Sequence, residues 1–364
     1  IWKKKLLYKG FKVVPYCPRC GTPLSSHEVA QGYKEVKERS AVVRFKIKGE
    51  EGYFLAWTTT PWTLPSNVAL CVHPDLEYAK VKAADGNLYI LAVARLDAVL
   101  SGLAKEGEEA YSILETCKGK DLVGLSYEPL YDGAEKEAER QHKKAHIVVS
   151  DYYVSADDGT GIVHIAPAFG EDDGRIGREN DLALVKFVDS EGKLTAETPF
   201  FGMRCKPTEK EVAEGAISAD PEVLKDLEKR GLLFDAPKFE HSYPHCWRCG
   251  TPLIYYARES WFIKMTAVRD ELVANNNTVN WIPESIGKGR FGDWIENVQD
   301  WSLSRDRYWG TPLNIWECKD CGEQEAIGSI KELSERADNY QEVLSKLKTE
   351  GDKGYSSDYV GYEH

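Results

Sequence analysis

Two near-copies of one ten-residue segment, far apart in the sequence, constrain the fold of this chain most strongly. Residues 15–24 read Pro-Tyr-Cys-Pro-Arg-Cys-Gly-Thr-Pro-Leu, and residues 244–253 read Pro-His-Cys-Trp-Arg-Cys-Gly-Thr-Pro-Leu. In each segment, here called a knuckle, the two residues between the cysteines let backbone N–H groups point at the sulfur atoms. The glycine after the second cysteine suits a tight turn. Two such knuckles supply four thiolates, which is the ligand set of a closed, structural zinc site.

The two knuckles therefore predict one structural zinc ion, bound by Cys17, Cys20, Cys246 and Cys249. A single ion would hold both knuckles within a few ångströms of each other. Everything between them must then form a lobe whose entry and exit meet at one neck, as in a domain inserted into another domain. A disulfide framework is disfavoured because the sequence shows no secretory signal. A redox site is disfavoured because neither pair opens a βαβ unit.

A third Cys-x-x-Cys pair, Cys318 and Cys321, has no later pair to complete it. It is either half of a second zinc site whose other half lies outside this sequence or an unpaired knuckle, and we favour the first. The remaining cysteines, Cys71, Cys117 and Cys205, are isolated and are expected to be small buried hydrophobic residues.

The chain has 364 residues, enough for two or three domains, and it reads as a piece of a larger protein because Met203 and Met265 are its only methionines. No apolar run approaches the roughly 18 to 20 residues that span a bilayer, so no membrane contact is expected. The net charge of −12 argues against sequence-independent binding along a nucleic acid, although it permits binding of a nucleic-acid end at one local site. The expected parts are a first knuckle at 1–30, the lobe at 31–240, a second knuckle at 241–262 and a separate segment at 263–364.

Short strands dominate the expected secondary structure of the lobe. Residues 41–48 alternate between apolar and charged side chains, as a half-buried strand does. Many short strands with few helices predict an α+β chain, in which a closed, β-barrel-like lobe with helical decoration is inserted through the zinc-knuckle neck and followed by a mixed α/β segment. The other predicted elements are strands at 52–58, 146–149 and 161–165, a hairpin at 77–92 turning at Asp85-Gly86-Asn87, and helices at 96–105, 220–229 (with Asp220 as its cap), 266–274 and 284–296.

Two segments are polar where a strand should end. Residues 57–67, Trp-Thr-Thr-Thr-Pro-Trp-Thr-Leu-Pro-Ser-Asn, present several hydroxyl groups between prolines. Such a rigid set of donors and acceptors suits a sugar or an ester. The alternative is a threonine-rich strand edge that turns at Pro61.

The second segment, 159–173, runs from Gly-Thr-Gly through a short apolar strand to acidic residues. It places His164 at the strand end and Asp172 and Asp173 after a loop controlled by proline and glycine. A carboxylate there can pair with a cationic substrate group, and a histidine can orient water, act as a base or limit the size of the substrate. The alternatives are a satisfied core histidine and two acidic residues that favour a helix N-terminus.

Taken together, these two segments resemble the editing (CP1) domain of the isoleucyl-tRNA synthetase family. The strings at 57–65 and 159–167 look like the two editing signatures of that family. Valyl and leucyl enzymes typically carry Thr-Thr-Arg-Pro-Glu/Asp-Thr in the first, whereas this chain has Thr-Pro-Trp at 60–62. Residues 300–312 are similar to the stretch where the family's chain re-enters its class I catalytic core. The resemblance covers essentially the whole chain, and it implies that 263–364 is a partial return to that core and the start of the next insertion.

The resemblance implies hydrolysis of valine esterified to the 3′ end of the isoleucine tRNA, with isoleucine excluded by size, and it leaves hydrolysis of valyl-adenylate open. Such a second site is needed because one methylene gives an apolar pocket only weak discrimination. Water positioned by hydroxyl groups is favoured over a covalent intermediate, because the sequence shows no Ser-His-Asp or Cys-His arrangement. By this resemblance, Asp173 binds the substrate ammonium, and His164 lines the pocket and acts either as a base or as a steric gate. Thr58, Thr59 and Thr60 contact the ester, the terminal ribose and the attacking water. Trp57 shapes the wall of the pocket, and Asn67 lies nearby.

The chain lacks the His-x-Gly-His and Lys-Met-Ser-Lys-Ser motifs of a full-length synthetase, so it is not expected to form aminoacyl-adenylate. The expected partners are the tRNA 3′ end and the remainder of the synthetase, in the cytoplasm, and the expected cofactor is structural zinc. Three alternatives stay open: a valyl- or leucyl-type editing domain, a non-catalytic zinc-ribbon binding module, and a zinc hydrolase that uses His245 beside Cys246.

Overall fold

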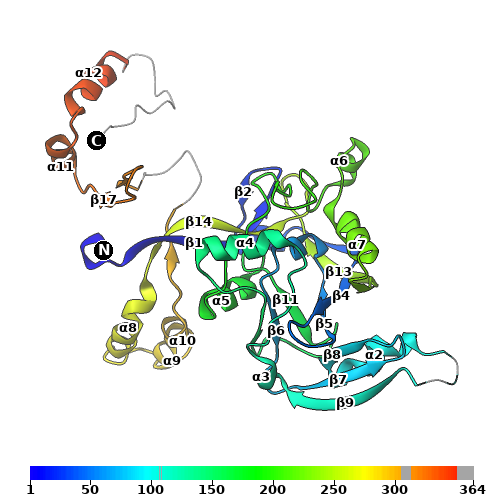
Figure 1. Cartoon of the computed structure of the whole chain (residues 1–364). Helices are drawn as coiled ribbons and strands as arrows, with labels where there is room; N and C mark the ends of the chain where they lie inside the picture. Colours follow the sequence, from blue (N-terminus) through cyan, green and yellow to red (C-terminus); the bar gives the residue numbers. More distant parts are fainter. Residues whose placement is uncertain (106, 108, 305–312, 351–364) are drawn as a thin grey trace. The chain divides into compact units, whose positions relative to one another are not determined.

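The computed structural model describes residues 1–350 except 106, 108 and 305–312, with side chains described up to residue 346 (Figure 1). It divides into two compact units. The larger unit is the continuous segment Phe11–Glu259, and the smaller unit combines the residues before and after that segment.

The larger unit holds most of the strands. Its strands are β2 (Thr22–Pro23), β3 (Tyr33–Arg39), β4 (Ala41–Lys46), β5 (Tyr53–Thr58), β6 (Ala69–Val72), β7 (Glu77–Ala83), β8 (Leu88–Ala92), β9 (Tyr111–Lys118), β10 (Ile147–Ser150), β11 (Ile162–Ile165), β12 (Leu233–Asp235) and β13 (Lys238–Pro244). Its helices are α1 (Ser26–Ala30), η2 (Pro61–Ser66), η3 (Val93–Arg95), α2 (Leu96–Leu100), η4 (Ser101–Leu103), α3 (Gly119–Leu122), α4 (Asp132–Gln141), α5 (Glu171–Glu179), α6 (Glu209–Ala213) and α7 (Ala219–Lys229), where η marks a 3-10 helix.

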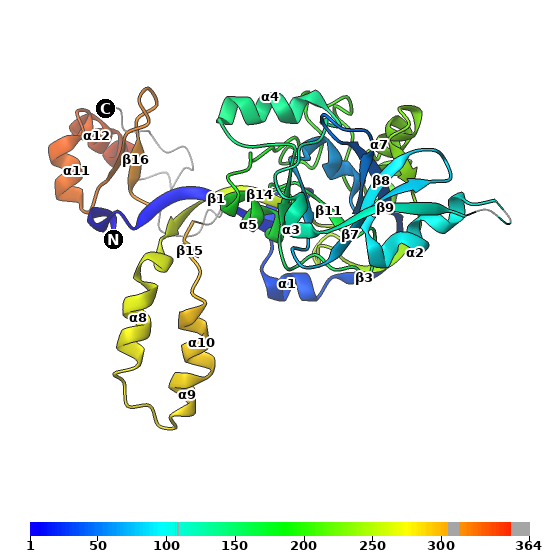
Figure 2. The ribbon, with the colours of Figure 1, turned by 60° about the horizontal axis from the view of Figure 1, so that its bottom comes forward.

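The smaller unit is mainly helical, and α8 and α10 lie side by side in it (Figure 2). Two long strands, β1 (Leu7–Cys17) and β14 (Ile254–Ile263), pass from one unit into the other along the chain. Its remaining elements are η1 (Trp2–Lys4), η5 (Met265–Val268), α8 (Arg269–Asn276), α9 (Ser285–Lys288), α10 (Arg290–Glu296), β15 (Trp301–Ser302), β16 (Ile315–Glu317), β17 (Gln324–Ala326), α11 (Ile330–Arg336) and α12 (Tyr340–Glu350).

A nine-stranded mixed sheet forms the core of the larger unit, in the order β10-β6-β11-β5-β8-β7-β9 with β4 and β12 beside this path. The mixed α/β composition and the barrel-like curvature expected from the sequence are present, but the sheet is a curled half-barrel and not a closed barrel, because its end strands β9 and β10 do not pair. The reason lies in β5, whose first residues pair with β8 at Tyr53 and Phe54 and whose end pairs with β11 at Trp57. Since one edge of β5 serves two different strands, the sheet diverges there instead of closing.

Both faces of the central strands are buried, which explains their continuous apolar sequences. Along β6, Leu70 and Val72 join one hydrophobic cluster while Cys71 joins another on the opposite face. The same alternation in β11 puts Ile162 and Ile165 into different clusters. A polar side chain in such a strand is withdrawn from water and must find its partners within the protein.

Each element that local patterns predicted is present, and the corrections concern its ends. The hairpin is present as β7 and β8. The helix expected at 96–105 is α-helical only to Leu100, and the helix expected at 284–296 is interrupted at Gly289, whose backbone is not helical. Asp220 is not the cap of α7, because Ser218 occupies that position and Asp220 instead accepts a hydrogen bond from the Trp62 backbone N–H at 2.8 Å.

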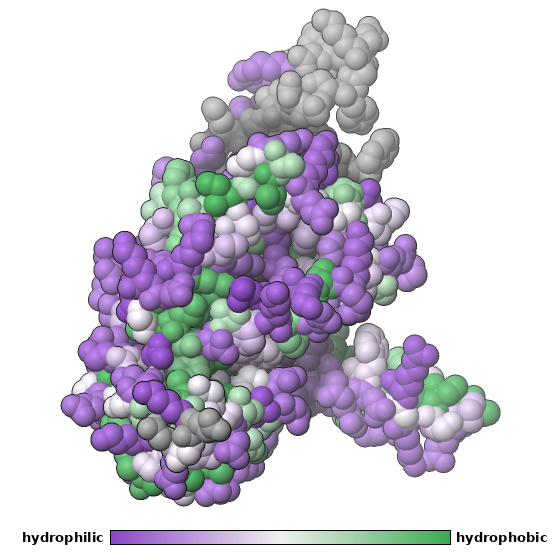
Figure 3. Space-filling model, turned by 90° about the vertical axis from the view of Figure 1, so that its right-hand side faces the viewer, coloured by the Kyte–Doolittle hydropathy of each residue, from purple (hydrophilic) through white to green (hydrophobic). Residues whose placement is uncertain are grey.

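Figure 3 shows one face on which hydrophilic side chains prevail and hydrophobic ones are interspersed among them. In the part of the chain that the structure describes, no helix has the length and apolar character that a bilayer crossing requires.

A buried ion network links three parts of the larger unit. The Lys206 ammonium lies 2.7 Å from Glu38 in β3 and 3.1 Å from Asp220 in α7, and only 4% of its side chain is exposed. Burial opposes the charged form of Lys206, but Asp220, Tyr243 and Glu38 outweigh this effect, raise its pKa above the ordinary value and keep the amine charged. Because Asp220 also binds the Trp62 N–H, the network fixes the start of η2.

Lys206→Met is expected to lower the free energy of unfolding by about 3–5 kcal/mol, because it leaves two carboxylates without their buried cation. Urea unfolding followed by circular dichroism measures this. The matched control is Lys193→Met, which removes the exposed pair between Lys193 and Glu191 and should cost less than about 1 kcal/mol. Equal effects of the two substitutions would contradict the structural role of the network.

Candidate functional site

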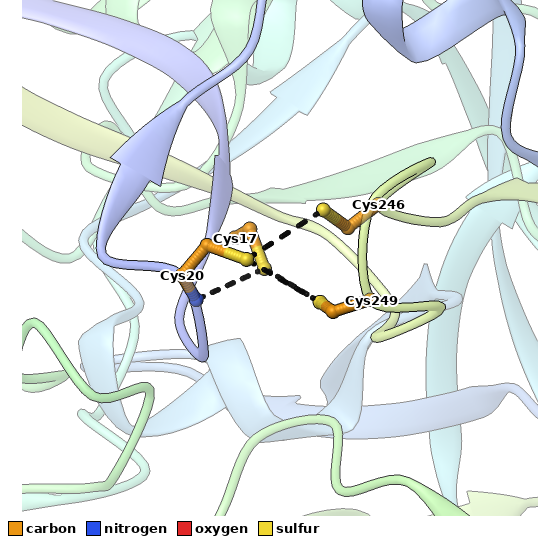
Figure 4. Close-up of side chains that lie close together, drawn as sticks. All are labelled: Cys17, Cys20, Cys246 and Cys249. Carbon is orange, nitrogen blue, oxygen red and sulfur yellow. Dashed lines mark hydrogen bonds between the residues drawn. The ribbon is translucent and has the colours of Figure 1, made fainter.

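Four cysteines from the two knuckles meet at one point (Figure 4). Their Sγ atoms all lie within 4.8 Å of one another. The Sγ atom of Cys249 is 3.5 Å from those of Cys17 and Cys20, and Cys20 is 4.0 Å from Cys246. Four thiolates at the usual zinc–sulfur distance of about 2.3 Å lie about 3.8 Å apart, so this arrangement fits a tetrahedral ion.

The two knuckles share one backbone conformation, as their sequences predicted. In each, the glycine after the second cysteine has positive φ, 67° at Gly21 and 70° at Gly250. Its N–H donates to the carbonyl of the first cysteine at 2.9 Å and 2.8 Å. A side chain at this left-handed position would be strained, which is why both copies carry glycine.

The third pair has the same turn but no completed ligand set. Gly322 has φ 72° and donates to the Cys318 carbonyl at 3.0 Å. Within the described residues, the four-cysteine cluster is the only group of three or more candidate ligands, so Cys318 and Cys321 stand without further ligands there. His245, the extra ligand of the zinc-hydrolase alternative, is not in that cluster, and its Nδ1 lies 2.9 Å from the Tyr243 carbonyl oxygen.

The two polar segments end on the same edge of the curled sheet. Strand β11 runs parallel to β5, with Val163 opposite Trp57, and antiparallel to β6, with His164 opposite Leu70. The carboxyl ends of β5 and β11 and the start of β6 therefore coincide. This register brings together Thr58, His164 and Asn67, which the sequence singled out separately.

His164 is buried and both of its ring nitrogens have partners. Nε2 lies 2.8 Å from the Thr63 hydroxyl oxygen, and Nδ1 lies 3.0 Å from the Asn67 side-chain nitrogen. Burial lowers the pKa of His164 to about 3, so the ring is neutral at pH 7. No ring nitrogen is left to take a proton from water, so this geometry favours a steric or positioning role over a base.

The Thr63–His164 contact is not a nucleophile–base pair. The Thr63 hydroxyl donates to the Thr60 carbonyl oxygen at 2.7 Å, and no carboxylate orients the far side of the imidazole, where Asn67 sits. Thr63 is also only 3% exposed. The arrangement needed for a covalent intermediate is therefore absent from this part of the described structure.

The consecutive threonines Thr58, Thr59 and Thr60 differ in burial and in the hydrogen-bond partners of their hydroxyl groups. The Thr58 hydroxyl accepts the Thr60 N–H at 3.1 Å and lies 3.3 Å from the Thr60 hydroxyl. The Thr60 hydroxyl lies in turn 3.3 Å from that of Thr63. Thr59 and Thr60 are half-buried, whereas Thr58 is buried. This row of hydroxyl groups can bind a polar ligand without a formal charge.

Asp173 and its neighbour Asp172 have opposite environments. Asp172 is exposed and pairs with Arg175 at 3.3 Å. Asp173, in the first turn of α5, is half-buried and accepts the Ala166 N–H at 2.8 Å, and no cation among the described residues contributes to its pKa shift. Burial raises the pKa of Asp173 to about 7, against the opposing effect of the Ala166 N–H. A cation is the group that such a carboxylate lacks.

Trp57 connects the two segments through a glycine. A Cβ atom on Gly159 would lie 2.7 Å from the Trp57 ring, so only glycine allows the second segment to approach the indole this closely. Gly161 is confined in the same way, because its Cβ would lie 2.4 Å from that of Ala92. The Gly-Thr-Gly string is thus required by packing.

Sequence reasoning missed two residues of this site. Thr63 lay within the quoted hydroxyl run, and its spacing from Thr60 in a 3-10 turn could have indicated it. Tyr127 had no local signal, yet its hydroxyl donates to the Asn67 side-chain oxygen at 2.7 Å from a position 1% exposed. The expected catalytic-core stretch at 300–312 lies partly outside the described residues.

Comparison with known proteins gives one consistent family. The family model described as tRNA synthetases class I (I, L, M and V) matches residues 1–354. The isoleucine–tRNA ligase of Clostridium novyi (strain NT) is 53% identical over 350 residues, 96% of this chain and 31% of that protein. The isoleucine–tRNA ligase of Bacillus thuringiensis (strain Al Hakam) is 48% identical over 334 residues, 92% of this chain and 30% of that protein. The chain thus spans about a third of the length of the curated relatives it matches.

Among solved structures, the editing domain of the P. knowlesi cytosolic leucyl-tRNA synthetase overlaps with 58% of this chain and 99% of that chain. The identity is 15% and the TM-score 0.38, a likeness too distant to support any assignment of residues.

Proposed function

This chain belongs to the class I tRNA synthetases, and we propose that its larger unit is the editing domain of an isoleucyl enzyme, which hydrolyses valine from mischarged isoleucine tRNA. One observation carries the proposal. An uncompensated, half-buried carboxylate, Asp173, accepts the Ala166 N–H two residues beyond His164. The strand end that carries His164 lies beside the end of β5, where the row of threonine hydroxyls begins. An aminoacyl ester offers the complementary groups, an ammonium beside a carbonyl and a ribose.

In this proposal Asp173 pairs with the substrate ammonium, and Thr58, Thr59 and Thr60 contact the ester, the terminal ribose and the attacking water. His164 is a neutral wall that limits the length of the side chain, which valine passes and isoleucine does not. Trp57 shapes the opposite wall, and Asn67 holds His164. Water adds directly to the ester carbonyl, the bond from that carbonyl carbon to the ribose oxygen breaks, and the ribose oxygen takes up the proton that water loses. Valyl-adenylate offers the same ammonium and carbonyl.

We also propose that the four-cysteine cluster binds one structural zinc ion. The sulfur spacing supports this, as does the closed set of four thiolates, which leaves no open position for catalysis. Zinc there joins the first and last segments of the larger unit and stabilises the base of the editing domain. The remainder of the synthetase and the tRNA 3′ end are the proposed partners, in the cytoplasm.

The direct test compares the release of valine and of isoleucine from isoleucine tRNA by this chain. The valyl and isoleucyl esters of adenosine serve as small substrates, because their hydrolysis does not require binding of the tRNA body. Valine is expected to be released at least about tenfold faster, since rejection of isoleucine is steric. Thr60→Val should slow the reaction, whereas Thr195→Val, which removes a buried hydroxyl without a described partner, should not. Release of neither amino acid from either substrate would contradict the proposal.

A further inference from the structure

A chain of hydrogen bonds crosses the interior behind the candidate site, and its direction can be read from its two ends. It runs from the Tyr127 hydroxyl through the Asn67 amide and the His164 ring to the Thr63 hydroxyl. All four residues are at most 5% exposed, so the protein supplies their partners.

At one end, a backbone carbonyl fixes the orientation of the Asn67 amide. The Asn67 atom 2.9 Å from the Ala69 carbonyl oxygen must be the NH₂ group, because a carbonyl oxygen only accepts. The amide oxygen then faces Tyr127, whose hydroxyl donates to it at 2.7 Å. The second N–H of the same NH₂ group points at His164 Nδ1, which must therefore be an acceptor.

At the other end, the Thr60 carbonyl independently indicates the same tautomer of His164. Thr63 uses its single hydroxyl proton for the Thr60 carbonyl oxygen at 2.7 Å. Its oxygen can then only accept at 2.8 Å from His164 Nε2, so Nε2 carries the proton. Two obligate acceptors at opposite ends thus select one tautomer of the ring.

We propose that Asn67, oriented by Tyr127, holds His164 as the neutral tautomer protonated on Nε2, and that Tyr127 is a positioning residue for the editing reaction. The effect on editing rests on the proposed function, whereas the tautomer does not. In this state His164 donates its only ring proton to Thr63 and fixes η2, which directly follows the row of hydroxyl groups at Thr58–Thr60. It is a rigid wall of the site and takes no proton from water.

The first test is long-range ¹H–¹⁵N correlation of the chain labelled with ¹⁵N-histidine at pH 7, in which the two ring nitrogens report the tautomer directly. The His164 signals are assigned by their absence from His164→Gln. The parent is expected to show a protonated Nε2 and an unprotonated Nδ1. A proton on Nδ1, or on both nitrogens, would overturn the proposal.

Two variants separate the contributions of Asn67 and Tyr127. Asn67→Asp presents only acceptors, so it should move the proton to Nδ1, and a proton that stays on Nε2 would show that Asn67 does not select the tautomer. Tyr127→Phe leaves the amide oxygen without its donor and should lower the valine release rate about tenfold with KM unchanged. The control is Tyr256→Phe, which removes another buried tyrosine hydroxyl, bonded to the Val188 carbonyl.

Equal rates for Tyr127→Phe and Tyr256→Phe would refute the positioning role of Tyr127. If the parent chain released no valine at all, the proposed function would fail while the spectrum still decided the tautomer. The two failures are therefore distinguishable.

Discussion

Asp173→Asn is expected to lower valine release by a hundredfold or more while leaving the fold intact. Removing one partner of a desolvated charge pair costs about 2–5 kcal/mol, and here the lost pair is the one with the substrate ammonium. The fold should persist because the asparagine oxygen can still accept the Ala166 N–H. The rate of valyl-tRNA deacylation under single-turnover conditions measures the effect.

The matched control is Asp172→Asn, one residue earlier in the same helix turn. Its carboxylate pairs with Arg175 on the surface, so its loss should change the rate by less than about twofold. If Asp172→Asn were as inactive as Asp173→Asn, general loss of negative charge at the α5 N-terminus would explain the result better than an ammonium anchor.

Asp173→Asn is expected to raise the free energy of unfolding even though it lowers the rate of valine release. The sign of the stability change follows from the pKa of Asp173. Burial raises that pKa to about 7 in the folded chain, above the ordinary value of 3.8. The folded state therefore holds the proton more tightly, so this stabilisation is present below about pH 4 and is lost as the pH rises through 7. Asp173→Asn should exceed the parent by about 1–2 kcal/mol in free energy of unfolding at pH 8, after part of the gain is offset by the weaker interaction with the helix dipole.

Urea unfolding at pH 5 and pH 8 checks this, with the difference between the proteins shrinking at the lower pH. Valine release by the parent should also fall as the pH drops through 7, because a protonated carboxyl group cannot pair with an ammonium. A variant less stable than the parent at pH 8 would mean that Asp173 has a buried counter-charge in the folded protein.

Zinc removal is expected to have the largest effect on stability. The parent should contain one zinc ion per chain, and chelation should lower its unfolding temperature by about 10 °C or more, since structural zinc supplies folding free energy directly. Cys246→Ser should do the same without a chelator, because Cys246 is one of the four clustered ligands. Metal analysis and thermal unfolding followed by circular dichroism provide the two measurements.

Cys117→Ser is the control, because Cys117 is half-buried outside the cluster. Below its lowered unfolding temperature, the chelated chain should still release valine. Loss of turnover while the fold remained intact would instead indicate a catalytic metal, and an unchanged unfolding temperature would contradict structural zinc.

Features encoded within a few residues were predictable from the sequence. Each knuckle is closed by its own glycine and by its own hydrogen bond from that glycine's N–H to the carbonyl of the first cysteine. Because the two knuckles match in sequence, pairing them predicted that Cys17, Cys20, Cys246 and Cys249 lie together. The β7–β8 hairpin followed equally from its turn residues. In such cases short-range sterics and hydrogen bonds determine the conformation regardless of the rest of the chain.

The tertiary structure decided which polar groups are satisfied. Asp172 and Asp173 are adjacent in the sequence, yet only one of them has an arginine partner. Asp220 binds the Trp62 N–H, far from its own helix cap. Tyr127, with no local signal, reaches the amide that orients His164. Burial and hydrogen-bond partners depend on which distant segments share the interior, so local sequence could identify the candidate groups but not assign their protons, charges or partners.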